Sequence, residues 1–307
     1  LKQAGYETAV IGKWHLKKEP AAFDYYSVLP GQGWYFNPVF RQRGPQPWPR
    51  NTFSFPGYDS KHCSDAITDL SLRWLKSRKQ KEKPFFLMHH FKAPHDMFDN
   101  ARRYDSYLED VEIPEPESLY KRGKHGSVAT RGVNDSLLHE IGTSVSSRHK
   151  QRNMGKHMKV DQSLGEPEYT KLSYQRYLKR YLRCVKGVDD NVGRLFKYLE
   201  AEGLMDKTVI IYTGDQGFML GEHDYIDKRW MYEESMRMPL LARYPPMIKA
   251  GSRNSELVNN TDFAPTILAL AGVKTPGFMQ GMSFSGMLKG SIPANWRTAT
   301  YYRYWMH

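Results

Sequence analysis

The chain of 307 residues is long enough for one large domain, and 40% hydrophobic with 25% charged residues excludes a disordered or fibrous protein. The net charge of +12 favours anionic partners, but the Lys and Arg residues are spread out without a nucleic-acid-binding signature, so we expect no nucleic-acid function. The two cysteines, Cys63 and Cys184, are too few for a disulfide framework or a cysteine-rich zinc site, and no apolar run has transmembrane length.

The first 60 residues contain little regular periodicity. Residues 1–16 predict the end of a helix, a turn at Gly5, a short strand over Thr8–Ile11 and a loop from Gly12. Residues 17–60 are rich in Pro, Gly and aromatic side chains without a clear period. We therefore expect a long surface excursion there.

The next segment contains a predicted helix and a predicted strand. Apolar residues at helical spacing predict a helix over Asp65–Trp74, and Pro84–His90 has the pattern of a short buried strand. Residues 121–160 hold many Lys, Arg, His, Ser and Gly residues with few apolar ones. We expect an inserted basic loop there.

The second half of the chain alternates helix and strand. Apolar residues recur at three- and four-residue steps from Leu178 to Leu199 and predict a long helix that ends at Gly203. We expect a strand buried on both faces over Thr208–Thr213, another over Pro239–Tyr244, and a helix capped by Thr261 or Asp262 that runs through Leu270 to Gly272. Strands that alternate with helices predict an α/β fold with a mostly parallel central sheet.

Four polar clusters follow predicted strands, and functional groups gather at the carboxyl ends of such strands. They supply lysines and histidines for a tetrahedral oxyanion, and a carboxylate and an amide oxygen for a hard cation. Each cluster also has a plain structural interpretation, as a solvated loop cation, a turn histidine or a common turn sequence. The clusters are Gly12-Lys13-Trp14-His15, Lys92-Ala93-Pro94-His95, Asp215-Gln216-Gly217 and Asp227-Lys228-Arg229.

Three stretches resemble the sulfatases, formylglycine-dependent enzymes of the alkaline-phosphatase superfamily. Residues 5–16 (GYETAVIGKWHL) match the second sulfatase signature position for position, and residues 212–241 are similar to the metal- and sulfate-binding stretch of the family. Residues 260–272 are similar to a later family helix. The resemblance implies an alkaline-phosphatase-like fold, with a mostly parallel central sheet flanked by helices and truncated at both ends.

The resemblance also implies roles for individual residues. Lys13 and His15 orient and activate the formylglycine, and His95 and Lys228 bind the sulfate as catalytic residues, with His95 able to protonate the leaving alcohol. His223 and Arg229 contact the substrate. Asp215 and Gln216 ligate one divalent cation, usually Ca²⁺, with Mg²⁺ as an alternative; the family often has Asn or His where Gln216 stands.

The family nucleophile, a Cys or Ser in a Cys/Ser-x-Pro-Ser/Ala-Arg motif, does not occur in these residues, and neither Cys63 nor Cys184 matches it. We therefore expect a fragment whose nucleophile and remaining metal ligands lie upstream of Leu1, and which is inactive alone. Residues 1–290 would form the central and carboxyl-terminal part of the catalytic domain. Residues 291–307 would begin a missing C-terminal subdomain.

The favoured function is hydrolysis of a sulfate ester of a saccharide, because Glu222-His223 and residues 228–235 are most similar to the N-acetylglucosamine-6-sulfatase-like members. Two alternatives stay open: a phosphate or phosphonate ester hydrolase of the same superfamily, and a non-catalytic anion-binding protein. Family resemblance implies a periplasmic or extracellular location. The sequence leaves the oligomeric state and the individual substrate undefined.

Overall fold

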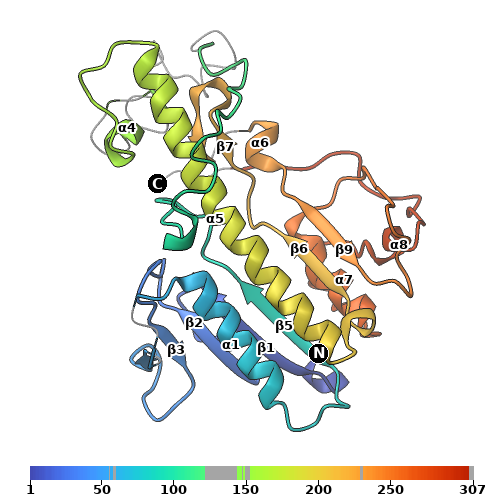
Figure 1. Ribbon diagram of the computed structural model, residues 1–307. Helices are drawn as coiled ribbons and strands as arrows, with labels where there is room; N and C mark the ends of the chain where they lie inside the picture. Colours follow the sequence, from blue (N-terminus) through green and yellow to red (C-terminus); the bar gives the residue numbers. More distant parts are fainter. Residues whose placement is uncertain are drawn as a thin grey trace. The chain divides into compact units, whose positions relative to one another are not determined.

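The chain folds into two compact units. The computed structural model describes residues 1–54, 56–57, 60–121, 144–146, 148, 153–228 and 231–303 (Figure 1). Unit 1 consists of Leu1–Tyr104, Cys184–Ile210 and Ala242–Thr300. Unit 2 consists of Asp105–Arg183, Ile211–Leu241 and the end of the chain from Tyr301.

Unit 1 is built on a five-stranded sheet of order β4-β3-β2-β1-β5. Its central strand β1 pairs in parallel with β2 on one side and β5 on the other, while β3 and β4 continue the sheet antiparallel. All three parallel strands therefore have their carboxyl ends at the same edge. The strands are β1 (Glu7–Lys13), β2 (Tyr25–Leu29), β3 (Phe40–Gln42), β4 (Thr52–Phe53) and β5 (Phe85–His90).

The surface excursion predicted for residues 17–60 is wrong, because three of these five strands lie in it. The strand β2 shows no polar alternation, since it is buried from Tyr26 to Leu29 between its neighbours. The other two strands have three and two residues, too few to show a period. The strand predicted at Thr8–Ile11 is confirmed, although it extends through Gly12 to Lys13 instead of ending in a loop.

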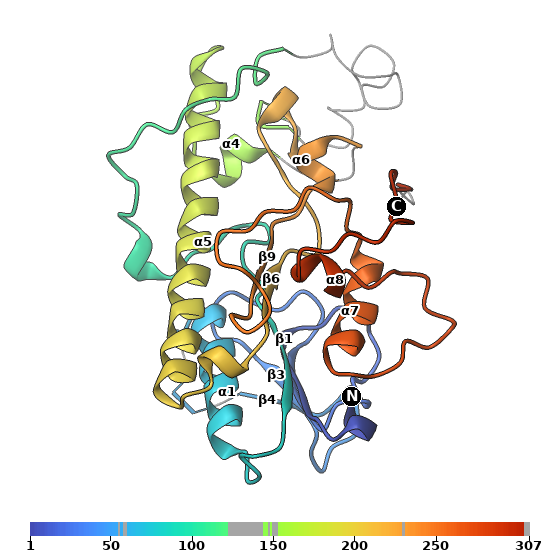
Figure 2. The same ribbon diagram turned by 90° about the vertical axis from the view of Figure 1, so that its right-hand side faces the viewer.

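Two helices cover one face of the sheet in unit 1. The helix α1 (Cys63–Ser77) contains the predicted helix 65–74 and packs Ile67, Leu70 and Trp74 against Ile11 of β1. The helix α5 (Glu168–Ala201) contributes Leu195 and Tyr198 to the same cluster from its unit 1 half. Figures 1 and 2 show α1 and this half of α5 side by side over the strands.

The opposite face of β1 and β2 forms a second cluster. Val10 alternates with Ala9 and Ile11 along β1 and packs with Tyr26 and Val28 of β2. This period of two places apolar side chains on both faces, as expected for a parallel strand that is covered on both sides.

The helix predicted to be capped by Thr261 or Asp262 is confirmed as α7 (Phe263–Leu270), with Asp262 at its N-cap position, although it ends at Leu270 rather than Gly272 and the Asp262 side chain forms no cap hydrogen bond to α7. The side-chain capping is found at the preceding short helix η6 (Asn260–Asp262). Asn259 forms a capping box with Asp262, whose carboxylate accepts the main-chain N–H of Asn259 at 2.7 Å. Asp262 also forms an ion pair with Arg297. The helices of this part of unit 1 are η6, α7 and α8 (Ser285–Leu288). Elsewhere, unit 1 contains the short helices η1 (Lys2–Ala4), η2 (Arg102–Tyr104) and η4 (Met205–Lys207).

The strands β6 (Ile210–Thr213) and β9 (Leu240–Arg243) form a separate two-stranded sheet where the chain passes between the units. Both predicted strands exist, but burial of 208–213 on both faces is wrong. Tyr212 is 39% exposed, and Ile210 is only half-buried. The β-branched sequence favours a strand without dictating how completely it is covered.

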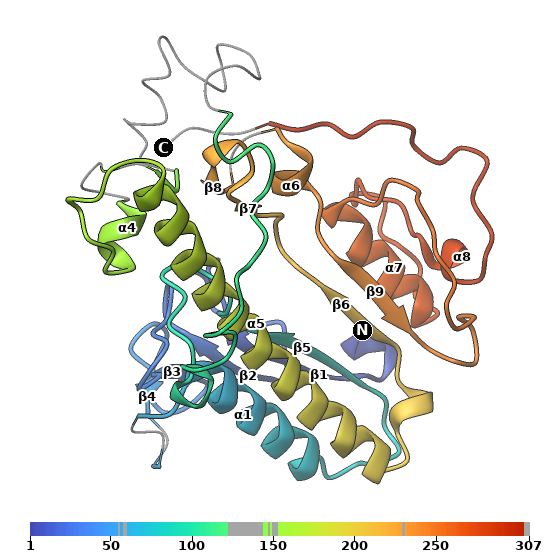
Figure 3. The ribbon, with the colours of Figure 1, turned by 45° about the horizontal axis from the view of Figure 1, so that its top comes forward.

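Unit 2 contains the first half of α5, which begins at Glu168 rather than near Leu178, and the antiparallel pair of β7 and β8. Figure 3 shows α6 beside these short strands. Its remaining elements are α4 (Met154–His157), β7 (Met219–Leu220), η5 (Glu222–Asp224), β8 (Ile226–Asp227) and α6 (Glu233–Met236).

The basic loop predicted for 121–160 falls partly outside the described residues. Within the part that is described, residues 153–158 form α4 and its flanks, and Met154, Met158 and Val160 are buried. The loop prediction is therefore wrong for this stretch. Among the helices that the structure describes, none is both long and apolar enough to cross a lipid bilayer.

Candidate active site

The carboxyl edge of the unit 1 sheet brings two predicted clusters together. Lys13 ends β1, and His95 follows β5, whose last residue His90 pairs with Gly12. His90 Nδ1 lies 3.1 Å from the main-chain oxygen of Lys13. The two loops thus leave the sheet from adjacent parallel strands.

Gly12 is required by this close approach. Its φ of +112° is unfavourable for other residues, and a Cβ there would lie 1.8 Å from the main-chain oxygen of His90. The glycine of the GKWH motif therefore lets β5 approach β1 just before Lys13.

Lys13 is held by an amide that sequence reasoning missed. Its Nζ donates to Oε1 of Gln32 at 2.6 Å. Gln32 follows β2 and therefore lies at the same edge of the sheet. Because β2 was not predicted from the sequence, nothing there indicated that Gln32 would lie near Lys13. His15, two residues beyond Lys13, is exposed.

The His95 loop is more enclosed. Nδ1 of His95 lies 2.5 Å from Oδ1 of Asp96, and Tyr35 donates its hydroxyl proton to the main-chain oxygen of His95. Lys92 is 7% exposed, and burial lowers the pKa of its ammonium group. Its Nζ lies 4.6 Å from the centre of the Tyr35 ring, a cation–π arrangement.

Neither cysteine of this unit is suited to act as a nucleophile, since both are buried. Burial raises the pKa of the Cys63 thiol to about 12, so this thiol stays protonated at neutral pH. The structure therefore agrees with the sequence in excluding Cys63 as a replacement for the family nucleophile.

Unit 2 holds the predicted metal ligands on the loop after β6. Gln216 donates from Nε2 to the main-chain oxygen of Ser235 at 2.6 Å, while Asp215 is exposed. A Cβ on Gly217 would lie 2.3 Å from the main-chain oxygen of Glu234, so the glycine allows the loop to approach the α6 backbone. Asp215 and Gln216 thus lie on a loop anchored to α6.

The predicted substrate-binding residues of unit 2 lie next to β7 and β8, with His223 in η5 between the two strands and Lys228 after β8. His223 donates its main-chain N–H to Oγ of Ser118 at 2.9 Å, and its ring stacks on Tyr232 with centres 5.0 Å apart. Lys228 directly follows β8 and is half-buried. Arg229 lies outside the described residues.

The two units divide the predicted site residues between them. Lys13, His15 and His95 belong to unit 1, whereas Asp215, Gln216, His223 and Lys228 belong to unit 2. Convergence of all these side chains on one pocket stays a prediction.

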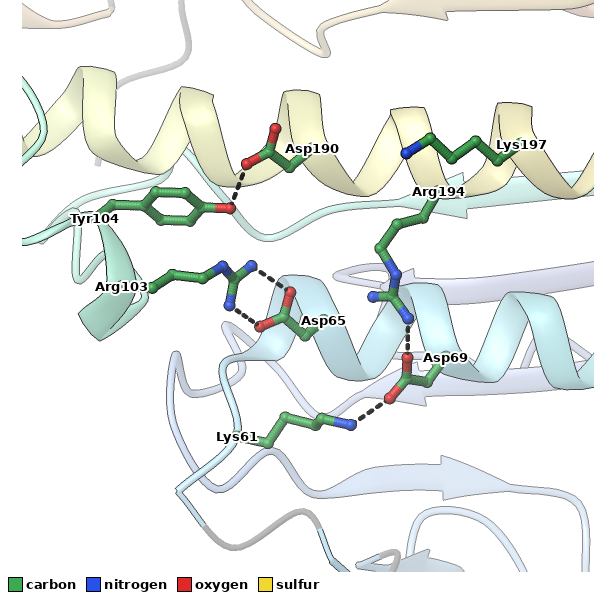
Figure 4. Close-up of a pocket in the computed structure, with 8 residues that line it drawn as sticks. All are labelled: Lys61, Asp65, Asp69, Arg103, Tyr104, Asp190, Arg194 and Lys197. Atoms are coloured by element: carbon green, nitrogen blue, oxygen red, sulfur yellow. Dashed lines mark hydrogen bonds and ion pairs between the residues drawn. The ribbon is translucent and has the colours of Figure 1, made fainter.

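A separate pocket of about 500 Å³ in unit 1 is lined by α1, η2 and α5 (Figure 4). Arg103 forms two hydrogen bonds with Asp65, each 2.7 Å, and Lys61 and Arg194 both pair with Asp69. Tyr104 and Asp190 are joined at 2.7 Å, and Lys197 completes the lining. Because most of these charges are paired with each other, we assign the cluster to joining α1, η2 and α5.

Comparison with known proteins gives consistent matches. The family model described as Sulfatase matches residues 1–273. Over 99% of its length the chain is 39% identical to an N-acetylglucosamine-6-O-sulfatase of Bacteroides thetaiotaomicron and covers 59% of that protein. Over 96% of its length it is 29% identical to human N-acetylglucosamine-6-sulfatase and covers 49% of it. The chain therefore spans about half of the length of the curated relatives that it matches.

Two solved structures extend these matches. A protein in complex with its substrate, D-glucosamine-2-N,6-O-disulfate, aligns with the whole chain at a TM-score of 0.86 and 36% identity, and the chain covers 67% of it. A phosphonate monoester hydrolase from Silicibacter pomeroyi aligns over 96% of this chain and 61% of its own at a TM-score of 0.67 and 21% identity, a likeness of fold alone. These alignments confirm the expected alkaline-phosphatase-like α/β fold. Since the family model matches most of its residues, the chain belongs to the sulfatase family.

Proposed function

We propose that this chain is part of the catalytic domain of a sulfatase that hydrolyses the 6-O-sulfate ester of an N-substituted glucosamine. The 39% identity with an N-acetylglucosamine-6-O-sulfatase over 99% of the chain carries this proposal. Residues 1–290 would belong to the catalytic domain, and residues 291–307 would begin a C-terminal subdomain.

The unit 1 edge would supply the proton-transfer groups. Lys13 and His15 would act on the nucleophile, a formylglycine made from a Cys or Ser motif that these 307 residues do not contain. His95 would protonate the leaving alcohol oxygen. The hydrogen bond from Lys13 to Gln32 supports this division, because it fixes the ammonium group beside the end of β1.

Unit 2 would supply cation and sulfate binding. The donors fit a hard divalent cation such as Ca²⁺: Asp215 offers a carboxylate, and the 2.6 Å bond from Gln216 Nε2 to Ser235 leaves Oε1 as the ligand atom. Among the described residues no group of three His, Cys, Asp or Glu side chains forms a metal site, so these two oxygens would be part of a larger set. When bound, the cation would neutralise charge at the reacting sulfate.

Lys228 and His223 would bind the anionic and sugar parts of the substrate, with Arg229 as a further contact. Lys228 follows the strand that pairs with β7, and His223 is fixed at its main chain by Ser118 and at its ring by Tyr232. A fixed ring and a short loop reduce the entropy that substrate binding has to overcome.

The test uses protein expressed from the complete gene. Sulfate release is measured from N-acetylglucosamine-6-sulfate, from its 3-sulfate isomer, and from a phosphonate monoester. We expect turnover of the 6-sulfate above the other two substrates. Lys13→Ala and His95→Ala should each lower kcat by about 100-fold or more. Lys289→Ala, at an exposed position distant in sequence from every motif, is the matched control.

Two results would replace the proposal. A higher kcat/KM for the phosphonate monoester would identify an ester hydrolase of the other branch of the superfamily. Binding of the sulfated sugar without turnover would identify a non-catalytic anion-binding protein. The proposal also includes an exported location, periplasmic or extracellular, which cell fractionation with an antibody to the protein tests.

A further inference from the structure

Among the residues that the structure describes, the partners of the His95 imidazole contact one of its two nitrogens. Nδ1 lies 2.8 Å from the main-chain oxygen of Asp96 and 2.5 Å from its carboxylate Oδ1. Both of these atoms are acceptors, so Nδ1 carries a proton in the neutral as well as the charged ring. Within the described residues no hydrogen bond to Nε2 is found.

The main chain of His95 is held by Tyr35. The hydroxyl of Tyr35 donates to the His95 main-chain oxygen, and Tyr35 is 5% exposed. Burial raises the pKa of this hydroxyl well above its usual value, so it remains a donor at neutral pH. The main-chain oxygen of Tyr35 accepts the N–H of Cys63 at 2.7 Å, which ties Tyr35 to the start of α1.

The ring of Tyr35 is itself held by two further side chains. His62 stacks on it with ring centres 5.4 Å apart and an angle of 26° between planes, and Lys92 lies over it. Nε2 of His62 is 2.8 Å from the main-chain oxygen of Asp99, and its Nδ1 accepts from Ser64. The same loop is thus anchored at 95 and again at 99.

The loop ends at the ion pair shown in Figure 4. Arg103 binds Asp65 of α1 through two bonds of 2.7 Å each, and Asn191 of α5 donates to the same carboxylate at 2.9 Å. The loop is thus held at residues 95, 99 and 103, so the backbone of His95 has little freedom to move. The orientation of the His95 ring can still change, and Asp96 is the residue that contacts this ring.

We propose that Asp96 and Tyr35 are positioning residues for His95: Asp96 holds the proton on Nδ1 so that Nε2 transfers the proton, and Tyr35 fixes the main chain from which the ring projects. The inference deepens the proposed function and rests on it. In the step concerned, the oxygen of the proposed formylglycine nucleophile bonds to sulfur while the bond between sulfur and the bridging oxygen breaks, and the electron pair of that bond passes to the bridging oxygen. The Nε2 proton of the charged ring moves to the bridging oxygen, and the ring is left neutral, with its remaining proton on Nδ1 and hydrogen-bonded to Asp96.

If Asp96 had only a structural role, its loss would affect the two kinds of substrate differently from the loss of a positioning residue. A sugar alkoxide is a poor leaving group and needs a proton, whereas 4-nitrophenolate leaves readily without one. If Asp96 acts through the proton on His95, its loss should slow the sugar sulfate much more than the aryl sulfate. If it only stabilises the loop, both substrates should lose activity in the same proportion.

The experiment measures kcat and KM for N-acetylglucosamine-6-sulfate and 4-nitrophenyl sulfate with protein from the complete gene. For Asp96→Asn we expect kcat on the sugar sulfate to fall about 10- to 100-fold, with less than about a threefold fall on the aryl sulfate and little change in KM. Tyr35→Phe keeps the ring for His62 and Lys92, and should lower kcat on the sugar by about tenfold. Asp96→Glu should restore part of the lost rate.

The matched control is Asp99→Asn. It removes the same charge from the same loop, while the main-chain oxygen that meets His62 remains. We expect the ratio of the two kcat values to stay within about twofold of the wild-type ratio. An equal loss on both substrates for Asp96→Asn, or the same change of ratio for Asp99→Asn, would overturn the inference. Thermal unfolding of each variant separates misfolding from loss of positioning.

A second readout does not depend on activity. Nitrogen NMR of histidine-labelled protein, recorded at a pH at which the His95 ring is neutral and with its signals assigned from His95→Gln, should show the Nδ1–H tautomer in the wild type and a mixture in Asp96→Asn. A wild-type Nε2–H tautomer contradicts the inference. Absence of turnover of both sulfate esters by the wild type, with the Nδ1–H tautomer present, would instead count against the proposed function.

Discussion

His89 gives a stability prediction whose sign and size follow from its burial. The strand β5 places His89 toward α1, where Nδ1 lies 2.7 Å from Oγ of Ser71. Its Nε2 is buried and has no hydrogen-bond partner in the part of the chain that the structure describes. Burial lowers the pKa of His89 from 6.5 to about 3, with a smaller contribution from the neighbouring His90.

The folded state therefore binds this proton less readily than the unfolded chain. The stabilisation is fully present above pH 6.5 and is lost as the pH falls from 6.5 toward 3. At pH 4.5, about two pH units below the unfolded pKa, the loss is about 2.7 kcal/mol at roughly 1.36 kcal/mol per unit. His89 keeps some access to solvent, so this is an upper figure.

The assay compares urea unfolding of wild type and His89→Asn at pH 7 and pH 4.5. The asparagine amide can still meet Ser71 but does not titrate, so the variant should lose about 2 to 3 kcal/mol less than the wild type on acidification. Carboxylates titrate in both proteins and cancel in the difference. His157→Asn, at an exposed histidine, should behave as the wild type. Equal acid losses in the wild type and His89→Asn would refute the reasoning.

Three further outcomes are expected. Gly12→Ala should destabilise the protein by about 1 to 3 kcal/mol more than Gly5→Ala in thermal unfolding, because both glycines have positive φ but only at Gly12 would the added Cβ lie 1.8 Å from the His90 oxygen. Asp262→Asn should cost about 3 kcal/mol or more, since this fully buried carboxylate pairs with an arginine and accepts two main-chain hydrogen bonds; a loss below about 1 kcal/mol would contradict this. Gln216→Ala should weaken Ca²⁺ binding about tenfold or more in calorimetry without substrate, and unchanged affinity would remove Gln216 from the proposed ligand set.

The elements that could be predicted are those in which a single physical rule dominates. The apolar period along α5 and the β-branched run of β1 were sufficient, because burial on one helix stripe or on both strand faces leaves a direct mark on sequence. The GKWH and DQG motifs could be located for a different reason. Strand ends in α/β folds collect polar groups, and family resemblance assigned their chemistry.

What could not be predicted depends on contacts between residues distant in sequence. Gln32 becomes significant only once β2 is seen to lie beside β1, and β2 has no period that would reveal it. Tyr35 lies 60 residues from His95, and its hydroxyl contact has no sequence signal. Asp96 adjoins His95, but neighbouring residues in a chain often point apart, so only the folded structure shows that its carboxylate meets the ring.

Asp96 and Asp99, the two carboxylates of the His95 loop, both act on the charge of Lys92, but they differ in their contact with the His95 ring. A comparison of their variants is informative for this reason. Burial lowers the pKa of Lys92, and the nearby charges of Asp96 and Asp99 both oppose that shift. Removing either carboxylate therefore makes the buried ammonium group less stable in the same direction. Only Asp96 also contacts Nδ1 of His95. We therefore expect an effect on proton transfer that Asp96→Asn shows and Asp99→Asn lacks to act through the His95 ring.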